Sequence, residues 1–479
     1  MYQVRQLIAG GWGPDGDAGE LLVLDPSDGT EVSRAPVADP AAVAAAVKAA
    51  REAAPRWART APAERAAALH RAAAAVEAAA DQLAEVQTAE MGRPAGGARG
   101  GVEAGVASLR QYAELGPVHR GRALAGPAEA IDLMAVEPRG VVAAITPWND
   151  PVAVTCGLLG AALVTGNAVI HKPSERTPAT GWLLARLLDE HLPDGVLSLL
   201  TGAGPVGATL AAQDVDVVAH VGSTATGRAI AAACAVTGAK ALLENGGNDP
   251  VIVDADVDPE WAARQIALGA FANSGQLCVA VERVYAHTSI VERLSASLVR
   301  VAEAMKVGPG RDPRTELGPL VDRRHRDQVH GQVLAAVADG ARLLCGGFVP
   351  DGPGAFYPPT VLADCTDRMA VMREETFGPV APVLAVDSFD EALSRAANSA
   401  YGLSATVLTG SMQHAQRAWR ELPVGTVKIN AVFGGAPGGA AHPRRGSGQG
   451  FGYGPELLDE LTATKVVHIS APDGPKWGW

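Results

Sequence analysis

Short, continuous apolar runs alternate with segments of helical period along most of the chain. The runs have the length of buried strands and lie at 140–147, 166–173, 196–202, 216–223, 249–256 and 281–287. Runs of this kind, separated by helices, are typical of parallel sheets that are covered on both faces. The pattern therefore predicts an α/β fold.

Residues 40–90 have a different texture, rich in alanine with charges at helical spacing. We expect two or three helices here, broken near Pro55 and Pro62.

The full length of 479 residues exceeds what one core usually holds, so two or three domains are expected. The net charge of −12 disfavours nucleic acid and anionic membranes as partners.

Targeting and metal signals are weak. The N-terminus lacks the apolar core of a signal peptide, and the longest apolar run, 156–170, is too short to span a bilayer. The five cysteines are scattered without a CxxC pair or a Cys/His cluster. This spacing predicts no metal site and fits a reducing, cytoplasmic location.

One cysteine stands out by its position. Cys278, in "SGQLCVAVER", lies in the expected loop between the helix at 258–273 and the strand at 281–287. A free cysteine often packs simply as a small apolar group. Loops at strand ends, however, are where α/β proteins place their chemistry, which favours a nucleophile.

Two segments compete for a phosphate. "GAGPVG" (202–207) matches a dinucleotide fingerprint, but no carboxylate follows about 20 residues later, so we interpret it as a turn. "VGSTATG" (221–227) ends a strand and starts a helix whose free N–H groups suit a pyrophosphate. Lys172 and Glu175, at another strand end, could reach the ribose of an adenosine.

Taken together, the segments resemble the aldehyde dehydrogenase superfamily from about residue 5 to 470. The resemblance rests on eight short motifs in the family's order: "PWN" (147–149), "KPSE" (172–175), "GST" (222–224), "LENGG" (243–247), "GQLC" (275–278), "EETFGPV" (374–380), "YGL" (401–403) and "GTVKIN" (425–430).

The resemblance implies an NAD(P)-dependent oxidation of an aldehyde to a carboxylic acid. Cys278 would form a hemithioacetal and, after hydride transfer, a thioester. Asn149 and the backbone N–H of Cys278 would stabilise the oxyanion, and Glu244 would be the general base. NAD is the expected cofactor, with NADP possible, because Glu175 would repel a 2′-phosphate while the small Ser174 leaves room for it.

The resemblance also implies the contacts around these groups. The expected cofactor contacts are Trp148, Lys172, Ser174, Glu175, Gly222, Ser223, Glu375 and Phe377. The expected substrate pocket comprises Asp150, Gly157, Leu277 and Phe433.

Several positions depart from the family. Asp150 replaces a usual aromatic residue, Gly157 stands where bulk is common, and Asn245 replaces an apolar residue. The stretch 434–454 lacks the Arg-Glu pair that usually follows "GSGQG". These departures favour a polar or cationic aldehyde, with Asp150 as its anchor; the alternative is that Asp150 caps the following helix.

Two other functions stay open: an acylating enzyme that passes the acyl group to CoA, and a cofactor-independent cysteine esterase or hydrolase.

The resemblance implies two Rossmann-like parallel-sheet domains plus a small β oligomerisation flap, with a homodimer or homotetramer expected. The NAD(P)-binding domain would comprise 1–115, 137–243 and 431–460, the catalytic domain 244–430, and the oligomerisation segments 116–136 and 461–479.

Overall fold

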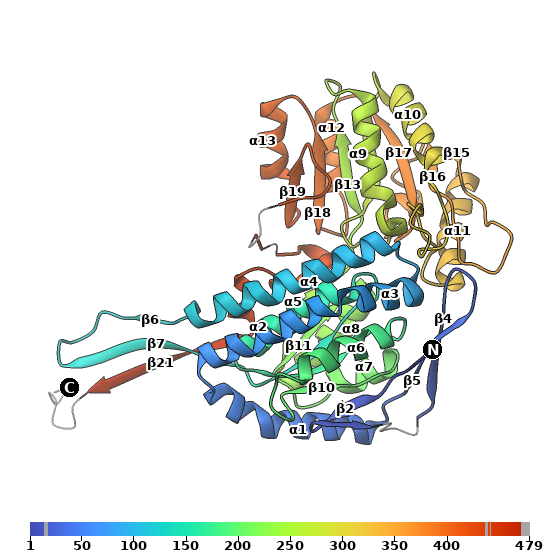
Figure 1. Cartoon of the computed structure of the whole chain (residues 1–479). Coiled ribbons are helices and arrows are strands. Elements are labelled where there is room, and N and C mark those ends of the chain that lie inside the picture. The colour runs from blue at the N-terminus through green and yellow to red at the C-terminus, as the bar shows by residue number, and fades with distance from the viewer. Residues whose placement is uncertain (14–17, 436–438, 441, 471–479) are drawn as a thin grey trace.

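Two large sheets organise the protein, one above the other in Figure 1. The computed structural model describes residues 1–13, 18–435, 439–440 and 442–470, so the end of the expected flap segment, 471–479, lies outside the described residues. Within them, eight strands form the first sheet and seven the second. The α/β prediction is confirmed.

The eight-stranded sheet has a parallel centre of five strands, bordered by short antiparallel strands. Its order is β20 (Gly448–Gln449), β12 (Lys240–Glu244), β11 (Val217–Val221), β8 (Val141–Ile145), β9 (Ala168–Lys172), β10 (Leu197–Leu199), β2 (Gln6–Ile8) and β3 (Gly11–Gly13).

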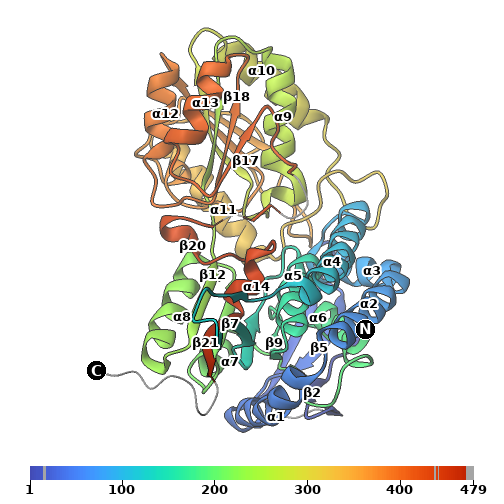
Figure 2. The same ribbon diagram turned by 90° about the vertical axis from the view of Figure 1, so that its left-hand side faces the viewer.

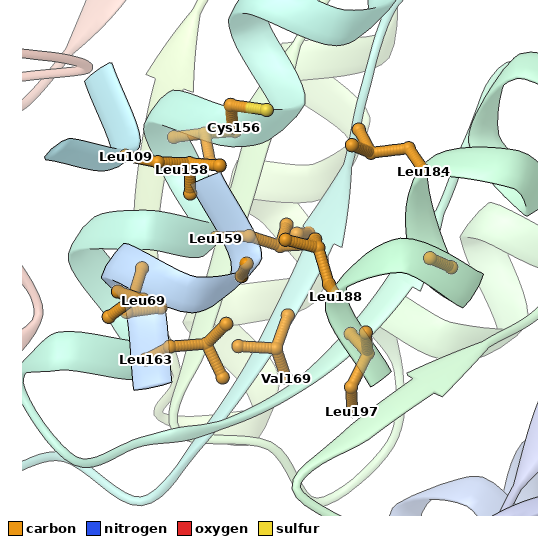
Figure 3. Close-up of a cluster of buried hydrophobic side chains, with 14 of the residues drawn as sticks. Leu69, Leu109, Cys156, Leu158, Leu159, Leu163, Val169, Leu184, Leu188 and Leu197 are labelled. Atoms are coloured by element: carbon orange, nitrogen blue, oxygen red, sulfur yellow. The ribbon is translucent and has the colours of Figure 1, made fainter. Parts of the chain in front are cut away.

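Alternate residues of the central strands enter two separate cores, because successive side chains of a strand point to opposite faces. Val142 and Val169 pack with one group of helices, and Val141 and Ile170 with another. The first group is α2 (Pro62–Ala78), α3 (Ala80–Met91), α4 (Ala95–Leu115), α5 (Pro151–Val164) and α6 (Pro178–Asp189); Figure 3 shows its leucines around Val169. The second is α1 (Pro40–Arg59), α7 (Gly204–Ala211) and α8 (Thr224–Thr237).

Helix α1 corrects one prediction, since it continues through Pro55. A proline inside a helix removes one N–H donor and crowds the preceding turn. Here Pro55 is exposed, while Ala53, Ala54 and Trp57 are buried, and Trp57 donates from Nε1 to the carbonyl of Leu163 at 2.9 Å. Packing on both sides of the proline therefore holds the helix together.

The seven-stranded sheet is also mostly parallel. Its order is β15 (Arg342–Cys345), β16 (Thr360–Ala363), β17 (Val380–Val386), β14 (Val281–His287), β13 (Asp249–Val253), β18 (Ser404–Leu408) and β19 (Thr426–Ile429). Helices α9 (Pro259–Phe271) and α10 (Val291–Ala304) share a core with one face, and α11 (Arg323–Ala338), α12 (Phe389–Ala397) and α13 (Met412–Glu421) with the other.

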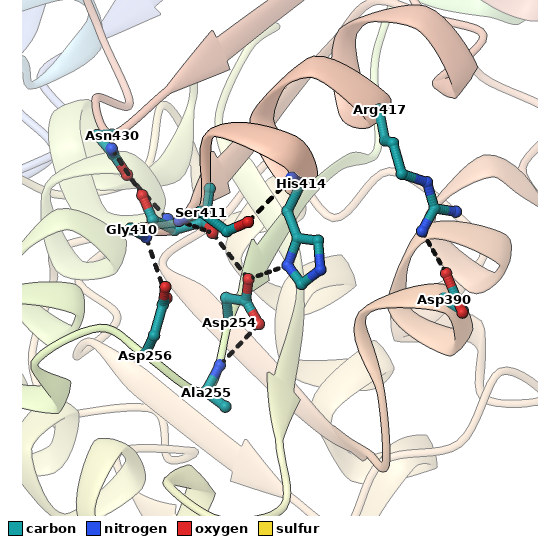
Figure 4. A network of polar contacts seen from close by, with 10 residues as sticks. Asp254, Ala255, Asp256, Asp390, Gly410, Ser411, His414, Arg417 and Asn430 are labelled. Carbon is teal, nitrogen blue, oxygen red and sulfur yellow. Dashed lines mark hydrogen bonds and ion pairs between the residues drawn. The ribbon is translucent and has the colours of Figure 1, made fainter.

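A polar network ties β13, β18 and α13 together at the carboxyl end of this sheet (Figure 4). The buried Asp254 carboxylate accepts hydrogen bonds from His414 Nδ1 (2.5 Å), Thr409 Oγ1 (2.7 Å) and the Ala255 N–H (2.9 Å). Asp249 begins the same strand, β13, at the opposite end of the sheet. The network thus lies one strand length from Asp249.

A three-stranded sheet extends away from the body in Figures 1 and 2. The last described strand, β21 (Thr462–Ser470), runs antiparallel along β7 (Ala130–Pro138), which also pairs with β6 (Arg122–Ala123). Strand β21 is an edge of this sheet, and its side chains are largely exposed. No helix in the described ranges is both long and apolar enough to cross a membrane.

Candidate active site

A cavity of about 1210 Å³ opens at the carboxyl ends of β8, β9 and β11. All eight residues expected to bind the cofactor line it, and Asn149 lines it too: Trp148, Asn149, Lys172, Ser174, Glu175, Gly222, Ser223, Glu375 and Phe377. Parallel strands end at one edge of a sheet, so residues from distant motifs meet there.

Helix α8 points its N-terminus at the cavity. Ser223 is the N-cap residue, and its Oγ accepts the Thr226 N–H at 3.3 Å. The first turn of a helix leaves N–H groups without intrahelical partners and carries a positive partial charge. A helix N-terminus of the kind suited to an anion therefore borders the cavity at the segment where we expect the pyrophosphate.

Lys172 and Glu175 line the part of the cavity where we expect the adenosine. Lys172 is buried, and its Nζ donates to the carbonyls of Pro173 (2.8 Å) and Gly202 (2.9 Å). Burial lowers the pKa of Lys172 to about 8, because the buried ammonium has lost part of its hydration. An oxygen-rich ligand would therefore stabilise the charged form of this side chain. The "GAGPVG" segment also contributes, because Gly204 and Gly207 at the start of α7 line the cavity.

The opposite end is aromatic. The Trp148 and Phe377 rings lie 5.5 Å apart, edge to face, and His325 completes the cluster. The carboxylate of Glu375, next to this cluster, accepts the Gly247 N–H at 3.0 Å. Burial, followed by the charge of Glu282, raises the pKa of Glu375 to about 8.

Helix α11 forms a wall of the cavity that the sequence did not reveal. Arg324, His325 and Gln328 of this helix line it. Arg176 connects this wall to the aromatic end of the cavity. Its guanidinium lies 5.1 Å from the centre of the Trp148 ring and 2.9 Å from Oδ2 of Asp322, the N-cap residue of α11. The start of α11 reads "DRRHRDQ", which is an ordinary charged helix start. That this helix lines the cavity becomes visible only in the packed structure.

These features fit a nicotinamide dinucleotide. The cavity has the size for a large ligand, with a helix N-terminus for the pyrophosphate, a buried ammonium near one end and aromatic rings with a carboxylate at the other. Among the described residues, no group of three or more His, Cys, Asp and Glu side chains is arranged to hold a metal ion.

The loop that carries Cys278 makes a tight reversal after α9. Asn273, Ser274 and Gly275 all have positive φ angles, of 50°, 59° and 73°. Ser274 Oγ donates to the Gly318 carbonyl at 2.8 Å, and Gln276 Oε1 accepts the Val321 N–H at 2.9 Å. These bonds fix the loop, and Cys278 emerges partly exposed, unlike the buried cysteines of the two cores.

Asn149 contacts the same loop. Its Nδ2 donates to the Gln276 carbonyl at 3.0 Å, and its own carbonyl accepts from Asn273 Nδ2 at 3.2 Å. The amide of Asn149 is therefore held close to the backbone around Cys278, on the border of the cavity.

Glu244 ends strand β12, and its Oε1 accepts the Gly452 N–H at 2.9 Å. Burial raises its pKa to about 8. Burial raises the pKa of Cys278 to about 12, and the carboxylates of Glu244, Asp249 and Glu375 add to that increase. Burial and these neighbouring carboxylates thus favour the protonated thiol of Cys278 over its thiolate.

Asp150 is neither a free anchor nor a helix cap. Its Oδ1 lies 2.8 Å from Arg93 Nη1, and its side chain makes no capping hydrogen bond to α5 in the described structure. The missing capping bond corrects the helix-cap alternative, while the nearby guanidinium of Arg93 compensates the charge of the carboxylate.

The other departures separate into two groups. Asn245 faces away from the site: its Nδ2 donates to the Gly446 carbonyl, and its Oδ1 lies against Gly227 of α8. It therefore does not make the pocket more polar. Gly157 has open space where a side chain would begin, and Leu277 and Phe433 are half-buried. These three do not line the large cavity.

Comparison with known proteins decides the family. The family model described as the aldehyde dehydrogenase family matches residues 12–467. The chain belongs to the aldehyde dehydrogenase family. The resemblance found in the sequence is confirmed, and the protein is an oxidoreductase that acts on aldehydes.

Individual relatives of this family member cover nearly all of it. A betaine aldehyde dehydrogenase of Cereibacter sphaeroides is 34% identical over 460 residues, which are 94% of this chain and 93% of that protein. The NAD-dependent aldehyde dehydrogenase of Sinorhizobium meliloti superposes with a TM-score of 0.95 at 32% identity, covering 99% of this chain and 96% of that one. The lactaldehyde dehydrogenase of Escherichia coli gives 0.95 at 33% identity, with 98% and 99% covered.

Proposed function

We propose that this family member oxidises a small polar aldehyde to its carboxylic acid with NAD, through a covalent intermediate on Cys278. One observation carries the proposal. Cys278 is partly exposed on a loop that the Asn149 amide contacts, and the charge of Glu244 acts on its thiol; Asn149 itself lines a cavity that fits a dinucleotide.

The first step is formation of a hemithioacetal. The Cys278 thiol gives up its proton to solvent, and the sulfur attacks the aldehyde carbon. The Asn149 amide and the backbone N–H of Cys278 donate to the developing oxyanion. NAD, when bound, would accept the hydride, and the first turn of α8 and Glu375 would hold it.

The second step is hydrolysis of the thioester that remains on Cys278. Glu244 accepts a proton from water, the water oxygen attacks the carbonyl, and the C–S bond breaks to release the acid. With a pKa of about 8, Glu244 is mostly protonated at pH 7, and the ionised fraction that can accept a proton from water grows as the pH rises through that value.

A small polar substrate is the proposal that agrees best with the relatives and the pocket. The relatives are named for betaine aldehyde and lactaldehyde. Gly157 leaves open space beside α5. We do not assign a cationic anchor to Asp150, because Arg93 already neutralises it.

A panel of aldehydes with NAD, read at the absorbance of NADH, tests the proposal. Polar aldehydes should be oxidised faster than long aliphatic ones, and CoA should not accelerate turnover. Glu244→Gln should keep a first burst of NADH while steady turnover falls about 10²-fold or more. Equal loss of both phases would reassign Glu244, and an ester hydrolase without NADH from any aldehyde would overturn the dehydrogenase.

We also propose a division of labour between the sheets and a homo-oligomeric assembly. The eight-stranded sheet would form the cofactor domain and the seven-stranded sheet the catalytic domain. The extended sheet of β6, β7 and β21 exposes Ile131, Val466 and Ile469, by 59%, 69% and 54%. An edge strand with exposed apolar side chains is what a partner subunit covers in a dimer or tetramer.

A further inference from the structure

The segment after "GSGQG" reaches back to the proposed general base. Strand β20 pairs antiparallel with the end of β12, with Gln449 opposite Leu243 and Gly448 opposite Glu244. The chain then returns, and the Gly452 N–H lies 2.9 Å from Glu244 Oε1. A residue 208 positions away in sequence therefore holds the carboxylate.

The contact leaves no room for a side chain at position 452. A Cβ atom built there would lie 2.2 Å from Glu244 Cγ and 2.4 Å from Oε1. Both distances are far below any van der Waals contact. The Cγ atom is near the root of the Glu244 side chain, so it could yield only if the carboxylate moved. Gly452 is thus matched to this one position of Glu244.

The returning segment is itself anchored on both sides. The Phe451 N–H donates to Glu460 Oε1 at 3.1 Å, and Glu460 forms an ion pair with Lys240 at the start of β12. The Gly450 N–H donates to His442 Nε2 at 3.2 Å. Gly452 is therefore presented by a fixed backbone.

We infer that Gly452 is a positioning residue, whose backbone N–H and missing side chain hold Glu244 where it can activate the water that hydrolyses the Cys278 thioester. This inference rests on the proposed function. The family resemblance leads one to expect an Arg-Glu pair after "GSGQG"; this chain has Phe451 and Gly452 there, so that a main-chain donor approaches Glu244. A hydrogen bond to the charged form also keeps the pKa of Glu244 lower than burial alone would set it.

Hydrolysis of 4-nitrophenyl acetate tests the inference without any cofactor. Acyl transfer to Cys278 releases a burst of nitrophenolate, and the steady phase reports attack of water on the acetyl thioester. In Gly452→Ala the burst should remain, and the steady rate should fall about tenfold or more. Its pH inflection should move upward from that of the wild type. The titratable groups on the segments packed around Glu244 are Cys278, His442, Lys240 and Glu460.

A double-mutant cycle separates positioning from general damage to the fold. If Gly452 acts only through Glu244, Gly452→Ala should have no further effect on the steady rate in a Glu244→Gln background. Independent, multiplying losses in the double variant would overturn the inference, as would a wild-type steady rate in Gly452→Ala. Gly100→Ala, on the exposed face of α4 with nothing within 4 Å, is the matched control and should behave as the wild type.

A second variant covers the case in which Gly452→Ala does not fold. Glu460→Ala removes the anchor of Phe451 without touching Glu244, and should lower the steady rate while keeping the burst. An unchanged steady rate in that variant would contradict the inference. Failure of the proposed function looks different: the wild type itself would then form no NADH from any aldehyde.

Discussion

Asp150 and Arg93, from the start of α5 and the loop before α4, form an ion pair with 2.8 Å between Oδ1 and Nη1. The pair is only partly exposed, so each charge depends on the other for compensation. Asp150 follows directly after the proposed oxyanion donor Asn149, and its charge state therefore bears on the choice of substrate.

Breaking this pair should increase the preference for cationic aldehydes. Asp150→Asn should leave the ranking of amino-aldehydes against neutral aldehydes unchanged. Arg93→Met frees the carboxylate and should raise kcat/KM for amino-aldehydes over neutral ones about tenfold, equivalent to about 1.4 kcal/mol. Arg99→Met, which breaks an exposed pair with Asp81, is the control. A changed ranking in Asp150→Asn would make that residue an anchor after all.

Glu175 should set the preference between the two dinucleotides. The carboxylate lines the adenosine end of the cavity near Lys172, where a 2′-phosphate would be repelled. Glu175→Gln should tighten NADP binding about tenfold and leave the Kd for NAD within about twofold. Quenching of tryptophan fluorescence measures both, and Glu190→Gln, exposed at the end of α6, should change neither. Equal changes for NAD and NADP would place the 2′-phosphate elsewhere.

Lys428 should control the reactivity of the nucleophile. Its Nζ lies 3.5 Å from Ser404 Oγ and 5.8 Å from the centre of the Phe433 ring. Burial and three carboxylates raise the pKa of Cys278, and the positive charge of Lys428 lowers it and so offsets part of that increase. Lys428→Met should raise that pKa further, because the thiolate loses its nearest compensating cation.

The rate of alkylation of Cys278 by iodoacetamide, followed against pH, measures this effect. Only the thiolate reacts, so the rate rises with pH towards the thiol pKa. The curve of Lys428→Met should be shifted to higher pH, with a rate at pH 8 at least about tenfold lower. Lys465→Met, on the exposed flap, should match the wild type. A shift to lower pH would show that Lys428 acts in another way.

Asp254 should make the fold sensitive to acid. Burial raises its pKa, but the bonds from His414, Thr409 and Ala255 outweigh burial and hold the pKa below its ordinary value. The stabilisation is complete above the pKa of the unfolded chain and is lost as pH falls through the lower, folded value. Asp254→Asn should therefore cost about 2 kcal/mol at pH 7, and much less at pH 2–3.

Denaturant titrations of wild type and variant at several pH values measure that difference. Asp390→Asn, which removes an exposed partner of Arg417, should cost less than about 0.5 kcal/mol at any of them. A pH-independent difference for Asp254→Asn would contradict the assignment.

The exposed edge of β21 should decide the assembly. Val466→Lys places a charge on a strand that we expect a second subunit to cover, and should reduce the molar mass seen by light scattering from that of a dimer or tetramer. Val236→Lys changes a residue that is 88% exposed on α8 and should leave the mass unchanged. A monomeric wild type would remove the basis for this assembly.

Local patterns predicted the elements well and the contacts between distant segments poorly. The strand at 168–172 and the helix at 224–237 are visible as a buried run and as a capped helix start, because their causes lie within a few residues. The predicted helix break at Pro55 was wrong, because the helix is held together by a contact of Trp57 with Leu163, more than 100 residues away in sequence. Contacts between segments that are distant in sequence could not be predicted from local patterns. They include the Arg93–Asp150 pair, the cavity wall made by α11 and the contact of Gly452 with Glu244.

The chain order of these contacts has a consequence for biosynthesis. Cys278 and Glu244 leave the ribosome long before Gly452, and the last described strand, β21, closes against β7 later still. A polypeptide that ends before residue 452 lacks the N–H group that holds Glu244. The position of the proposed general base is therefore set only after nearly the whole chain has been synthesised.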